Sequence, residues 1–303
     1  MDLDGIVYAG GEFVPAARAA VSVFDHGLLY GDGVFEGIRA YGGRVFKLGR
    51  HIDRLYESAK AIRLDIPLSR HAMSELVLET CRQNDIEDGY VRLVVTRGAG
   101  TLGIDPRSCP RPDVIVIARP AATLYRREAG RGITVVTSAL RRLRPDMLSP
   151  SIKSLNYLNN VLARIEANDR GADEALMLDS EGFVAEATVD NVFLLNDHAL
   201  VTPPAATNLR GITRETVLEL AADLGIPSGE QRFTLLDVWT AREAFLCGTS
   251  AEIVPIASVD GRQIGAGEPG PTTRRIIAAF ERAVRSSGTP IARAGSPVAE
   301  VRA

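Results

Sequence analysis

Lysine is scarce in this sequence of 303 residues, and the scarcity narrows the chemistry that the protein can perform. All but three of the 35 Lys and Arg residues are arginine, and the lysines are Lys47, Lys60 and Lys153. A reaction that needs a side-chain amine as nucleophile therefore has three candidates. The formal net charge is −3, so the sequence lacks the excess of basic residues that is typical of nucleic-acid-binding proteins. We therefore expect no nucleic-acid partner.

Cysteine is also scarce and widely spaced. Cys81, Cys109 and Cys247 form no CxxC pair, and their odd number does not indicate a disulfide framework. We predict small buried thiols in a reducing compartment. The N-terminus lacks the basic and apolar segments of a signal peptide, and no apolar run approaches the ~20 residues of a membrane span. We therefore expect a cytoplasmic protein with no membrane partner.

Hydrophobic patterns predict a mixture of strands and helices that come in blocks, which is typical of an α+β or α/β protein rather than of regular βαβ winding. In the first part of the chain, glycine pairs mark two hairpins, and apolar residues at helical spacing follow. The predicted elements there are hairpins at 6–14 and 34–48, helices at 48–62 and 73–81, and strands at 90–97 and 113–119.

A segment without strand alternation, which contains Pro120, separates two predicted domains. We assign 1–118 to a small N-terminal α+β domain, 119–130 to a linker, 131–290 to a large C-terminal domain and 291–303 to a loosely held tail. The elements predicted for the second domain are strands at 132–140 and within 174–195, and helices at 157–170, 213–224 and 272–286.

One glycine-rich segment, GAGTLG (98–103), matches the G-x-G-x-x-G pattern of dinucleotide-binding sites. Pro106 follows closely and disfavours the helix whose N-terminus would bind a pyrophosphate. The acidic residue expected about twenty residues later is missing, because residues 114–127 contain no Asp or Glu. We predict a loop on the substrate side of the protein instead of a NAD site.

The histidines indicate no metal site. His26, His51, His71 and His198 are scattered, and the motifs HExxH, GxSxG and GxxxxGK[ST] do not occur. We expect His51 and His71 to be surface or boundary residues of helices, and His26 to make a structural hydrogen bond in a loop. We predict no metal cofactor.

Among the lysines, Lys153 has the most distinctive surroundings. Lys47 ends a hairpin arm, and Lys60 lies in a helix where a solvated ion pair suits it. Lys153 lies between a β-rich run and a helix, where a reactive side chain can be both fixed and exposed. The same sequence also suits a polar helix start with Ser154 or Asn156 as N-cap, and local features alone favour that interpretation.

Three later segments change this balance. Glu186 lies on a predicted strand with apolar neighbours, so its carboxylate needs a partner such as a protonated ring nitrogen, unless it faces outward. Gly211, Ile212 and Thr213 begin a helix whose free N–H groups form either a phosphate cradle or an ordinary cap. Thr249 lies in a turn of small residues. An amine, an acid and two anion sites together match pyridoxal phosphate.

From about residue 5 to 286 the chain resembles the fold-type IV pyridoxal-phosphate aminotransferases, and most of all the branched-chain amino acid aminotransferases. The resemblance implies their two-domain fold and their cofactor. It is specific because several segments match in the order in which the family has them. These segments are YGDGVFEGIRAY (30–41), HIDRLYESAK (51–60), KSLNYLNN (153–160), EATVDNVF (186–193), LRGITRE (209–215) and FLCGTSAEIVPI (245–256).

The resemblance implies a role for each matching residue of the cofactor site. Lys153 matches the lysine that forms the Schiff base, Arg54 the phosphate-binding arginine of H-x-x-R-L, Tyr157 the tyrosine at the ring oxygen and Glu186 the acid at the pyridine nitrogen. The other residues that match cofactor contacts are Gly211, Ile212, Thr213 and Thr249.

The resemblance also implies a substrate site. Tyr90 and Arg92 match residues that bind carboxylates, and Thr249 and Ser250 match a turn that does so, although the family often has Ala at the second position. The residues that match the side-chain pocket are Tyr30, Phe35, Gly37 and Arg39, with Tyr30 reaching in from a second subunit.

The implied activity is transamination of branched-chain L-amino acids (Leu, Ile and Val) with 2-oxoglutarate by a ping-pong mechanism, in a homodimer or a higher homo-oligomer. Three other activities stay open: a D-amino acid aminotransferase, an aminodeoxychorismate lyase of the same fold, and a cofactor-binding protein without turnover. The segments IKSLN and HIDRLY resemble the D-amino acid enzymes, whereas Y-x-R and EGIR favour the branched-chain enzymes.

Overall fold

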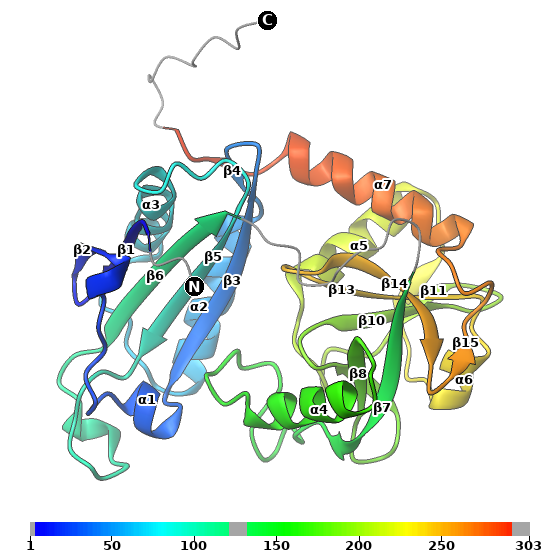
Figure 1. The fold of residues 1–303 in the computed structure, drawn as a ribbon, viewed down its shortest axis with the longest axis horizontal. Helices are drawn as coiled ribbons and strands as arrows, with labels where there is room; N and C mark the ends of the chain where they lie inside the picture. Colours follow the sequence, from blue (N-terminus) through cyan, green and yellow to red (C-terminus); the bar gives the residue numbers. More distant parts are fainter. Residues whose placement is uncertain (1–3, 121–131, 293–303) are drawn as a thin grey trace, which may run out of the picture.

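Two β-sheets organise the residues that this computed structural model describes, which are 4–120 and 132–292 (Figure 1). The first sheet has seven strands in the order β16-β4-β3-β5-β6-β1-β2, and all of its pairings are antiparallel. Its strands are β1 (Ile6–Ala9), β2 (Glu12–Pro15), β3 (Gly33–Tyr41), β4 (Arg44–Val45), β5 (Gly89–Thr96), β6 (Asp113–Pro120) and β16 (Thr289–Pro290).

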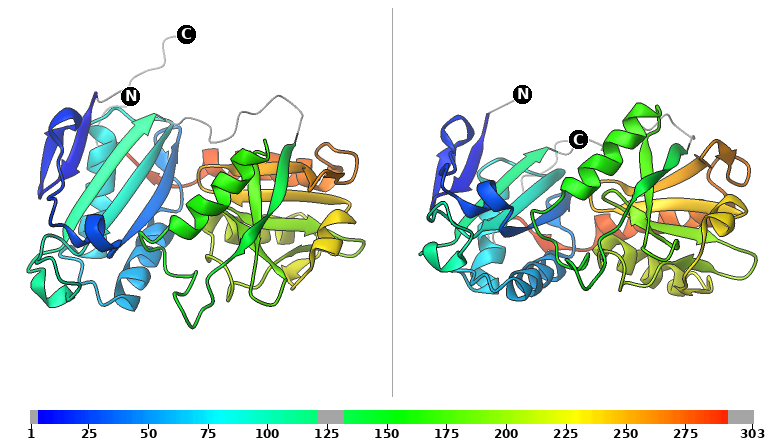
Figure 2. Two further views of the ribbon diagram at one scale, coloured as in Figure 1. Left: turned by 60° about the horizontal axis from the view of Figure 1, so that its bottom comes forward. Right: turned by 90° about the horizontal axis from the view of Figure 1, so that it is seen from below.

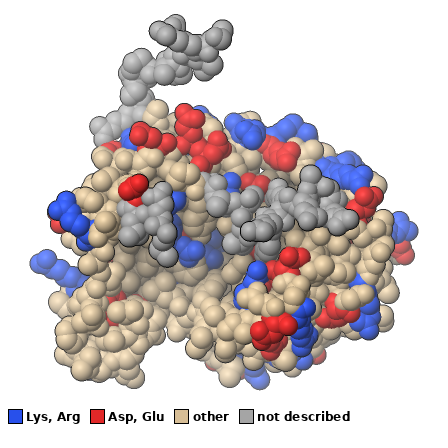
Figure 3. Space-filling view, viewed as in Figure 1, with Lys and Arg blue, Asp and Glu red and all other residues tan. Residues whose placement is uncertain are grey.

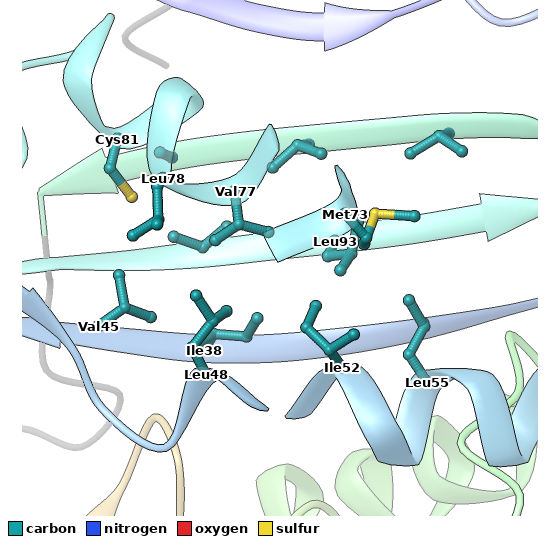
Figure 4. Close-up of a cluster of buried hydrophobic side chains, with 14 of the residues drawn as sticks. Ile38, Val45, Leu48, Ile52, Leu55, Met73, Val77, Leu78, Cys81 and Leu93 are labelled. Atoms are coloured by element: carbon teal, nitrogen blue, oxygen red, sulfur yellow. The ribbon is translucent and has the colours of Figure 1, made fainter. Parts of the chain in front are cut away.

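Two helices, α2 (Leu48–Ala61) and α3 (Arg70–Arg82), cover one face of the first sheet (Figure 1). The predicted apolar face of α2 is buried, and Leu48, Ile52 and Leu55 pack into the core with side chains of β3 and β5 (Figure 4). Helical spacing aligns these residues on one side of α2, so the helix and the sheet enclose an apolar core between them.

The second sheet has nine strands and mixed pairings, with the order β12-β11-β10-β13-β14-β7-β8-β9 and β15 paired to β14. The strands are β7 (Ile133–Arg141), β8 (Glu174–Leu178), β9 (Val184–Ala187), β10 (Asn191–Leu195), β11 (Leu200–Thr202), β12 (Ser228–Glu230), β13 (Glu243–Gly248), β14 (Glu252–Val259) and β15 (Arg262–Gln263).

Helices α5 (Ile212–Asp223) and α7 (Pro271–Ser286) pack on one face of the second sheet, around the stacked rings of Phe193 and Phe245. Figure 2 gives two further views of this arrangement. The remaining helices are α1 (His26–Tyr30), α4 (Leu158–Asp169) and α6 (Leu235–Trp239), with short 3-10 turns η1 (Ala16–Arg18) and η2 (Pro106–Ser108).

The chain returns to the first sheet after α7, which differs from the predicted domain limits. Strand β16 pairs with β4, and Ile291 is buried in the first core. Strand β6 also continues through Arg119 and Pro120, into the predicted linker. Backbone pairing of Pro120 with Gly89 extends the strand, since proline lacks only the N–H group. We propose one domain per sheet, with the first domain extending through Pro120 and including β16 and Ile291. The rest of the predicted linker and most of the tail lie outside the described residues.

Contacts between the two halves fix how the sheets face each other. Lys47 and Arg50, at the start of α2, form ion pairs with Glu219 and Glu215 of α5, at 2.6 and 2.9 Å. The guanidinium of Arg82 donates to the carbonyl of Ile291 at 2.6 Å, so the returning segment is also tied to the first half. Within the described ranges, no helix is long and apolar enough to span a membrane, and no cluster of side chains could hold a metal ion.

The three cysteines are free thiols. Cys81 and Cys247 are buried in the apolar clusters of the two halves, as predicted. Cys109 is only partly buried, because it directly follows η2 in the loop between β5 and β6. The prediction of a buried thiol is therefore wrong for Cys109.

Candidate functional site

A cavity of about 350 Å³ lies between the two sheets, within the size range of small-molecule sites. The strands β3 and β5 form one wall, and the start of α5 and the turn after β13 form the other. Most of the residues predicted for the site meet here: Phe35, Gly37, Arg54, Tyr90, Arg92, Lys153, Tyr157, Gly211, Ile212, Thr213, Thr249 and Ser250. Segments that are far apart in the sequence thus contribute to one site.

Lys153 projects into this cavity from the segment before α4. Its backbone N–H donates to Ser58 Oγ at 3.1 Å, and its carbonyl accepts from the N–H of Phe35 at 3.0 Å. The amine Nζ lies 3.4 Å from Tyr157 Oη and 4.7 Å from the centre of the Phe35 ring. Anchored at the backbone by the first half of the molecule, Lys153 therefore presents its amine to the cavity beside a phenol and an aromatic face.

The alternative interpretation of this segment, a polar helix start, is wrong. The N-cap residue of α4 is Tyr157, and no described side chain caps this helix end. Asn156 instead donates through Nδ2 to the carbonyl of Gly31 at 2.9 Å, while Ser154 Oγ accepts from the N–H of Asn156 at 3.4 Å. These polar residues tie the lysine segment to the loop after α1, because the chain has to bridge the two halves here.

The other two lysines have ordinary surroundings. Lys47 ends the hairpin arm and pairs with Glu219, and Lys60 is exposed on α2. Neither lines the cavity formed by the described residues. Lys153 is therefore the only lysine of the described residues that lines this cavity.

Glu186, on β9, is buried and has a protein cation as partner. Its Oε1 lies 2.6 Å from Arg142 Nη2, and its Oε2 accepts from Asn191 Nδ2 at 3.3 Å and from the N–H of Leu209 at 3.2 Å. Glu186 itself does not line the cavity of the described residues, whereas Asn191 and Leu209, which donate to it, do. The predicted need of this carboxylate for a cation is thus met within the chain by Arg142, which the sequence interpretation missed.

The start of α5 forms an anion cup on the second wall. Gly211 is the N-cap and has no side chain to satisfy the first N–H groups of this twelve-residue helix. A Cβ atom at Gly211 would lie 1.9 Å from Asn191 Oδ1, so the close approach requires glycine. The free N–H groups of Ile212 and Thr213 and the positive end of the helix favour a phosphate here.

Arg54, on α2, lies beside the cup and is held by a buried acid. Its Nε and Nη2 donate to the two oxygens of Glu36 at 2.7 and 2.8 Å, and its Nη1 donates to the carbonyl of Arg210 at 2.8 Å. Burial would raise the pKa of Glu36, but Arg54 and His51 outweigh it and lower that pKa to about 2. Glu36 is therefore an anion at neutral pH.

His51 is buried, and the prediction of a surface or boundary position is wrong. Its Nδ1 lies 2.8 Å from Glu36 Oε2, and burial lowers the pKa of its imidazole. The ring lies on the inner face of α2, one turn before Arg54. His26 makes the structural hydrogen bond that we predict, from Nε2 to the carbonyl of Thr101 at 2.8 Å, although it lies in α1 and not in a loop.

The wall formed by β3 and β5 carries the second arginine of the site, Arg92, whose partners differ from those of Arg54. The guanidinium of Arg92 lies 4.6 Å from the centre of the Phe35 ring and 5.6 Å from that of Tyr90. Burial raises the pKa of the Tyr90 phenol, which keeps it neutral. A Cβ atom at Gly37 would lie 2.1 Å from Tyr90 Oη, so the glycine makes room for this hydroxyl.

Two predicted pocket residues do not reach the cavity of the described chain. Tyr30 is partly exposed and donates to the carbonyl of Leu102, in the loop between β5 and β6. Arg39 is buried and lies 3.4 Å from Glu252 through Nη2, because β3 carries it past the cavity toward β14. Tyr30 on a second copy remains a prediction, and a pocket role for Arg39 is not supported within one chain.

The residues present fit pyridoxal phosphate. The amine of Lys153 can bond to an aldehyde, Arg54 and the cup can hold a phosphate, and Glu186 can hold a ring nitrogen proton. Gly211, which has no room for a side chain beside Asn191, lines the cavity at the start of α5. The glycine-rich segment 98–103 lies outside this cavity, and a 3-10 turn at Pro106 follows it instead of a dinucleotide-binding helix.

Comparison with known proteins agrees with this geometry. Residues 33–259 match the family described as Amino-transferase class IV. A putative branched-chain-amino-acid aminotransferase of Methanocaldococcus jannaschii is 52% identical over 276 residues, which cover 91% of this chain and 95% of that protein. A branched-chain-amino-acid aminotransferase of Pseudomonas aeruginosa is 40% identical and covers 92% of each chain.

A solved structure has the same fold. The T.th. branched-chain amino acid aminotransferase with pyridoxamine 5'-phosphate superposes with a TM-score of 0.89. It is 37% identical and covers 93% of this chain and 94% of its own. The predicted fold class is thereby confirmed.

Proposed function

This chain belongs to the class IV aminotransferases, and from that premise we propose that it transfers the amino group of branched-chain L-amino acids to 2-oxoglutarate. Its cofactor is pyridoxal 5'-phosphate. The observation that carries the proposal is the position of Lys153 Nζ in a cavity that has an anion cup on one wall and Arg92 with apolar groups on the other.

The cofactor side of the cavity would do two things. Arg54 and the N–H groups of Ile212 and Thr213 would hold the phosphate, and Glu186, which pairs with Arg142, would hold the proton on the ring nitrogen. When bound, pyridoxal phosphate supplies a ring that accepts electrons from the substrate. Lys153 would bind the cofactor and later carry a proton to and from the substrate Cα, because its amine is a base of suitable reach.

The substrate side combines apolar surface with one cation. Phe35 and Gly37 would leave an uncharged space for a branched side chain. Arg92 and Tyr90, with the Thr249–Ser250 turn of the opposite wall, would hold carboxylates. A site that accepts leucine and glutamate in turn needs both kinds of surface, and the wall of β3 and β5 offers Phe35 and Arg92 side by side.

We also propose a homodimer, supported by apolar side chains exposed in two places. Helix α4 exposes Leu158, Val161, Leu162 and Ile165 along one side. Near α1, the exposed residues are Val23, Phe24, Leu28, Leu29, Leu102 and Ile104. Figure 3 shows the lobe at the lower left, where Figure 1 places α1, with few charged side chains. Exposed apolar patches of this kind mark interfaces between proteins.

We also propose a cytoplasmic location, and both this location and the homodimer can be tested directly. Sedimentation of the wild type should give twice the chain mass, and replacing Leu162 with Glu on the exposed side of α4 should give monomers. A monomeric wild type would contradict the homodimer. A cytoplasmic location is supported by the three free cysteines, and a tagged chain found in a soluble cytoplasmic fraction would agree with it.

The test of the activity uses purified protein with 2-oxoglutarate and either L-leucine or D-alanine. We expect glutamate formation with L-leucine and little with D-alanine. Lys153→Ala should abolish transfer and the visible absorbance of the bound cofactor, whereas Lys60→Ala, which removes an exposed lysine, should keep both. Preference for D-alanine, or activity retained by Lys153→Ala, would contradict the proposal.

A further inference from the structure

We propose that Glu36 and His51 are positioning residues that hold Arg54 in the orientation required to bind the phosphate of the cofactor. This inference rests on the proposed function, because it assumes that the anion in the cup is that phosphate. Neither residue belongs to the cavity wall formed by the described residues, so both would act through Arg54.

Glu36 accepts one full edge of the Arg54 guanidinium. Its oxygens receive Nε and Nη2 at 2.7 and 2.8 Å, in the bidentate geometry that fixes the plane of an arginine most firmly. The Glu36 side chain is completely buried, and that of Arg54 is 10% exposed. Solvent therefore cannot replace these bonds, and the guanidinium has one favoured orientation.

His51 completes the support from the same helix. Its Nδ1 lies 2.8 Å from Glu36 Oε2, and because an ionised carboxylate can only accept, the imidazole donates. Spacing of three residues places His51 and Arg54 on the same side of α2. Glu36 is thereby held between a ring and a guanidinium, and it cannot rotate without losing both.

The remaining donors of Arg54 indicate what this support is for. A guanidinium has five N–H groups, and Glu36 takes two of them while the carbonyl of Arg210 takes a third. One N–H group remains on each terminal nitrogen. Arg54 lines the cavity beside Gly211 and Ile212, so these two groups are the ones that it can offer to an anion. A paired set of donors matches a phosphate.

The contact with Arg210 adds a second consequence. Arg210 directly precedes the N-cap of α5, in the second half of the molecule. Arg54 therefore connects β3 and α2 of the first half with the cup of the second half. If Glu36 and His51 hold Arg54 in place, they also hold the two parts of the phosphate site at a fixed distance.

Glu36, His51 and Arg54 would make the same contacts if they only stabilised the fold. The experiment therefore has to measure an effect that depends on the phosphate of the cofactor. Pyridoxal lacks the phosphate but has the same ring and aldehyde. Full-length cofactor-free protein is titrated with pyridoxal phosphate and with pyridoxal, and both dissociation constants are obtained from the visible absorbance. A positioning role changes the first constant, whereas general damage to the fold changes both.

The variants are Glu36→Gln, His51→Leu and His51→Asn. Glu36→Gln keeps the shape but removes one acceptor and the charge, so we expect the dissociation constant for pyridoxal phosphate to rise about thirtyfold and that for pyridoxal to change less than about twofold. His51→Leu should raise the first constant about fivefold, and His51→Asn, which keeps a donor near the Nδ1 position, should restore it. Glu243→Gln is the matched control, since Glu243 is a buried acid that caps α7.

The outcomes separate this inference from the proposed function. If wild-type protein binds neither compound, or binds pyridoxal as tightly as pyridoxal phosphate, the proposed phosphate site fails and the inference fails with it. If the wild type prefers pyridoxal phosphate but Glu36→Gln keeps the same preference, the positioning role alone is overturned. If Glu36→Gln does not fold, the two His51 variants decide, and equal preference in Leu and Asn overturns the proposal.

Discussion

The two walls of the cavity use arginine in different ways. Arg54, on the proposed cofactor side, is bound on one edge by Glu36 and on another by the carbonyl of Arg210. Arg92, on the proposed substrate side, lies over the rings of Phe35 and Tyr90 and forms no ion pair within the described residues. One charge is fixed and offset by a buried carboxylate, and the other is held against aromatic faces.

This difference matches the two ligands. The cofactor stays bound through both half-reactions, so a preorganised phosphate site with fixed donors suits it. Substrates exchange in every cycle and differ in charge. A cation on a flat aromatic surface can pair with the second carboxylate of glutamate and can also lie beside an uncharged leucine side chain. Four predictions, in order of decreasing effect, and one closing measurement test this contrast.

The largest effect is expected for Arg54→Met. It removes the proposed phosphate ligand and leaves the carboxylate of Glu36 buried without its main partner, which costs roughly 3–5 kcal/mol. We expect a protein that unfolds at much lower denaturant concentration and retains little cofactor. Chemical denaturation and the absorbance of bound cofactor measure the two effects. Stability and cofactor content near those of the wild type would contradict the account of this wall.

The next effect concerns pH. The pKa of Glu36 is lowered from 4.5 to about 2 in the folded protein. Ionised Glu36 therefore stabilises the fold at pH values above the pKa of the unfolded chain, and this contribution is lost as the pH falls through the pKa of the folded protein. The shift corresponds to about 3 kcal/mol, lost between about pH 4.5 and pH 2. Denaturation curves at several pH values measure it. Glu36→Gln should flatten this part of the profile, and an unchanged slope would contradict the assignment.

A smaller effect is expected on the substrate wall. Gly37→Ala places a Cβ atom where Tyr90 Oη lies, so the phenol must move. We expect kcat/KM for the amino donors to fall about ten- to a hundredfold, with cofactor binding unchanged, because a displaced substrate group costs rate without loosening the cup. Gly49→Ala is the control, since nothing lies within 4 Å of a Cβ atom there. Loss of cofactor in Gly37→Ala would show that the walls are not independent.

The smallest effect is expected one turn from Arg54 on the same helix. Arg50 pairs with Glu215 at 2.9 Å, but the Arg50 side chain is 57% exposed. Solvent screens such pairs, and Arg50→Gln should cost only about 0.2–1 kcal/mol in denaturation experiments. A loss as large as that of Arg54→Met would mean that contact between α2 and α5, and not the buried pair, holds the cup in place.

Local sequence patterns predicted most of the helices and strands. The apolar steps of α2 and the hairpins at Gly10–Gly11 and Gly42–Gly43 specify their own structure, because neighbouring residues determine it. Strand β16 could not be predicted in this way. It has two residues, and it exists because the chain returns to β4, which no local pattern encodes.

The site also combines residues that local sequence indicates with residues that only folding brings together. Lys153 and Gly211 lie in segments whose local sequence is distinctive, whereas Arg142 contacts Glu186 only in the folded chain, because the two residues are far apart in the sequence. Glu36 could have been found, since it is an acid among apolar strand residues, the very pattern that drew attention to Glu186. His51 also carried a signal, because helical spacing places it beside Leu48 and Leu55 on the apolar side of α2.

The contrast between the walls is tested most directly by Arg92→Met, with the dissociation constant of pyridoxal phosphate and the KM values for L-leucine and 2-oxoglutarate measured on one preparation. We predict that KM for 2-oxoglutarate rises about tenfold or more, that KM for L-leucine changes less, and that the cofactor binds as in the wild type. Weakened cofactor binding with an unchanged KM for 2-oxoglutarate would contradict the division of the cavity into a cofactor wall and a substrate wall.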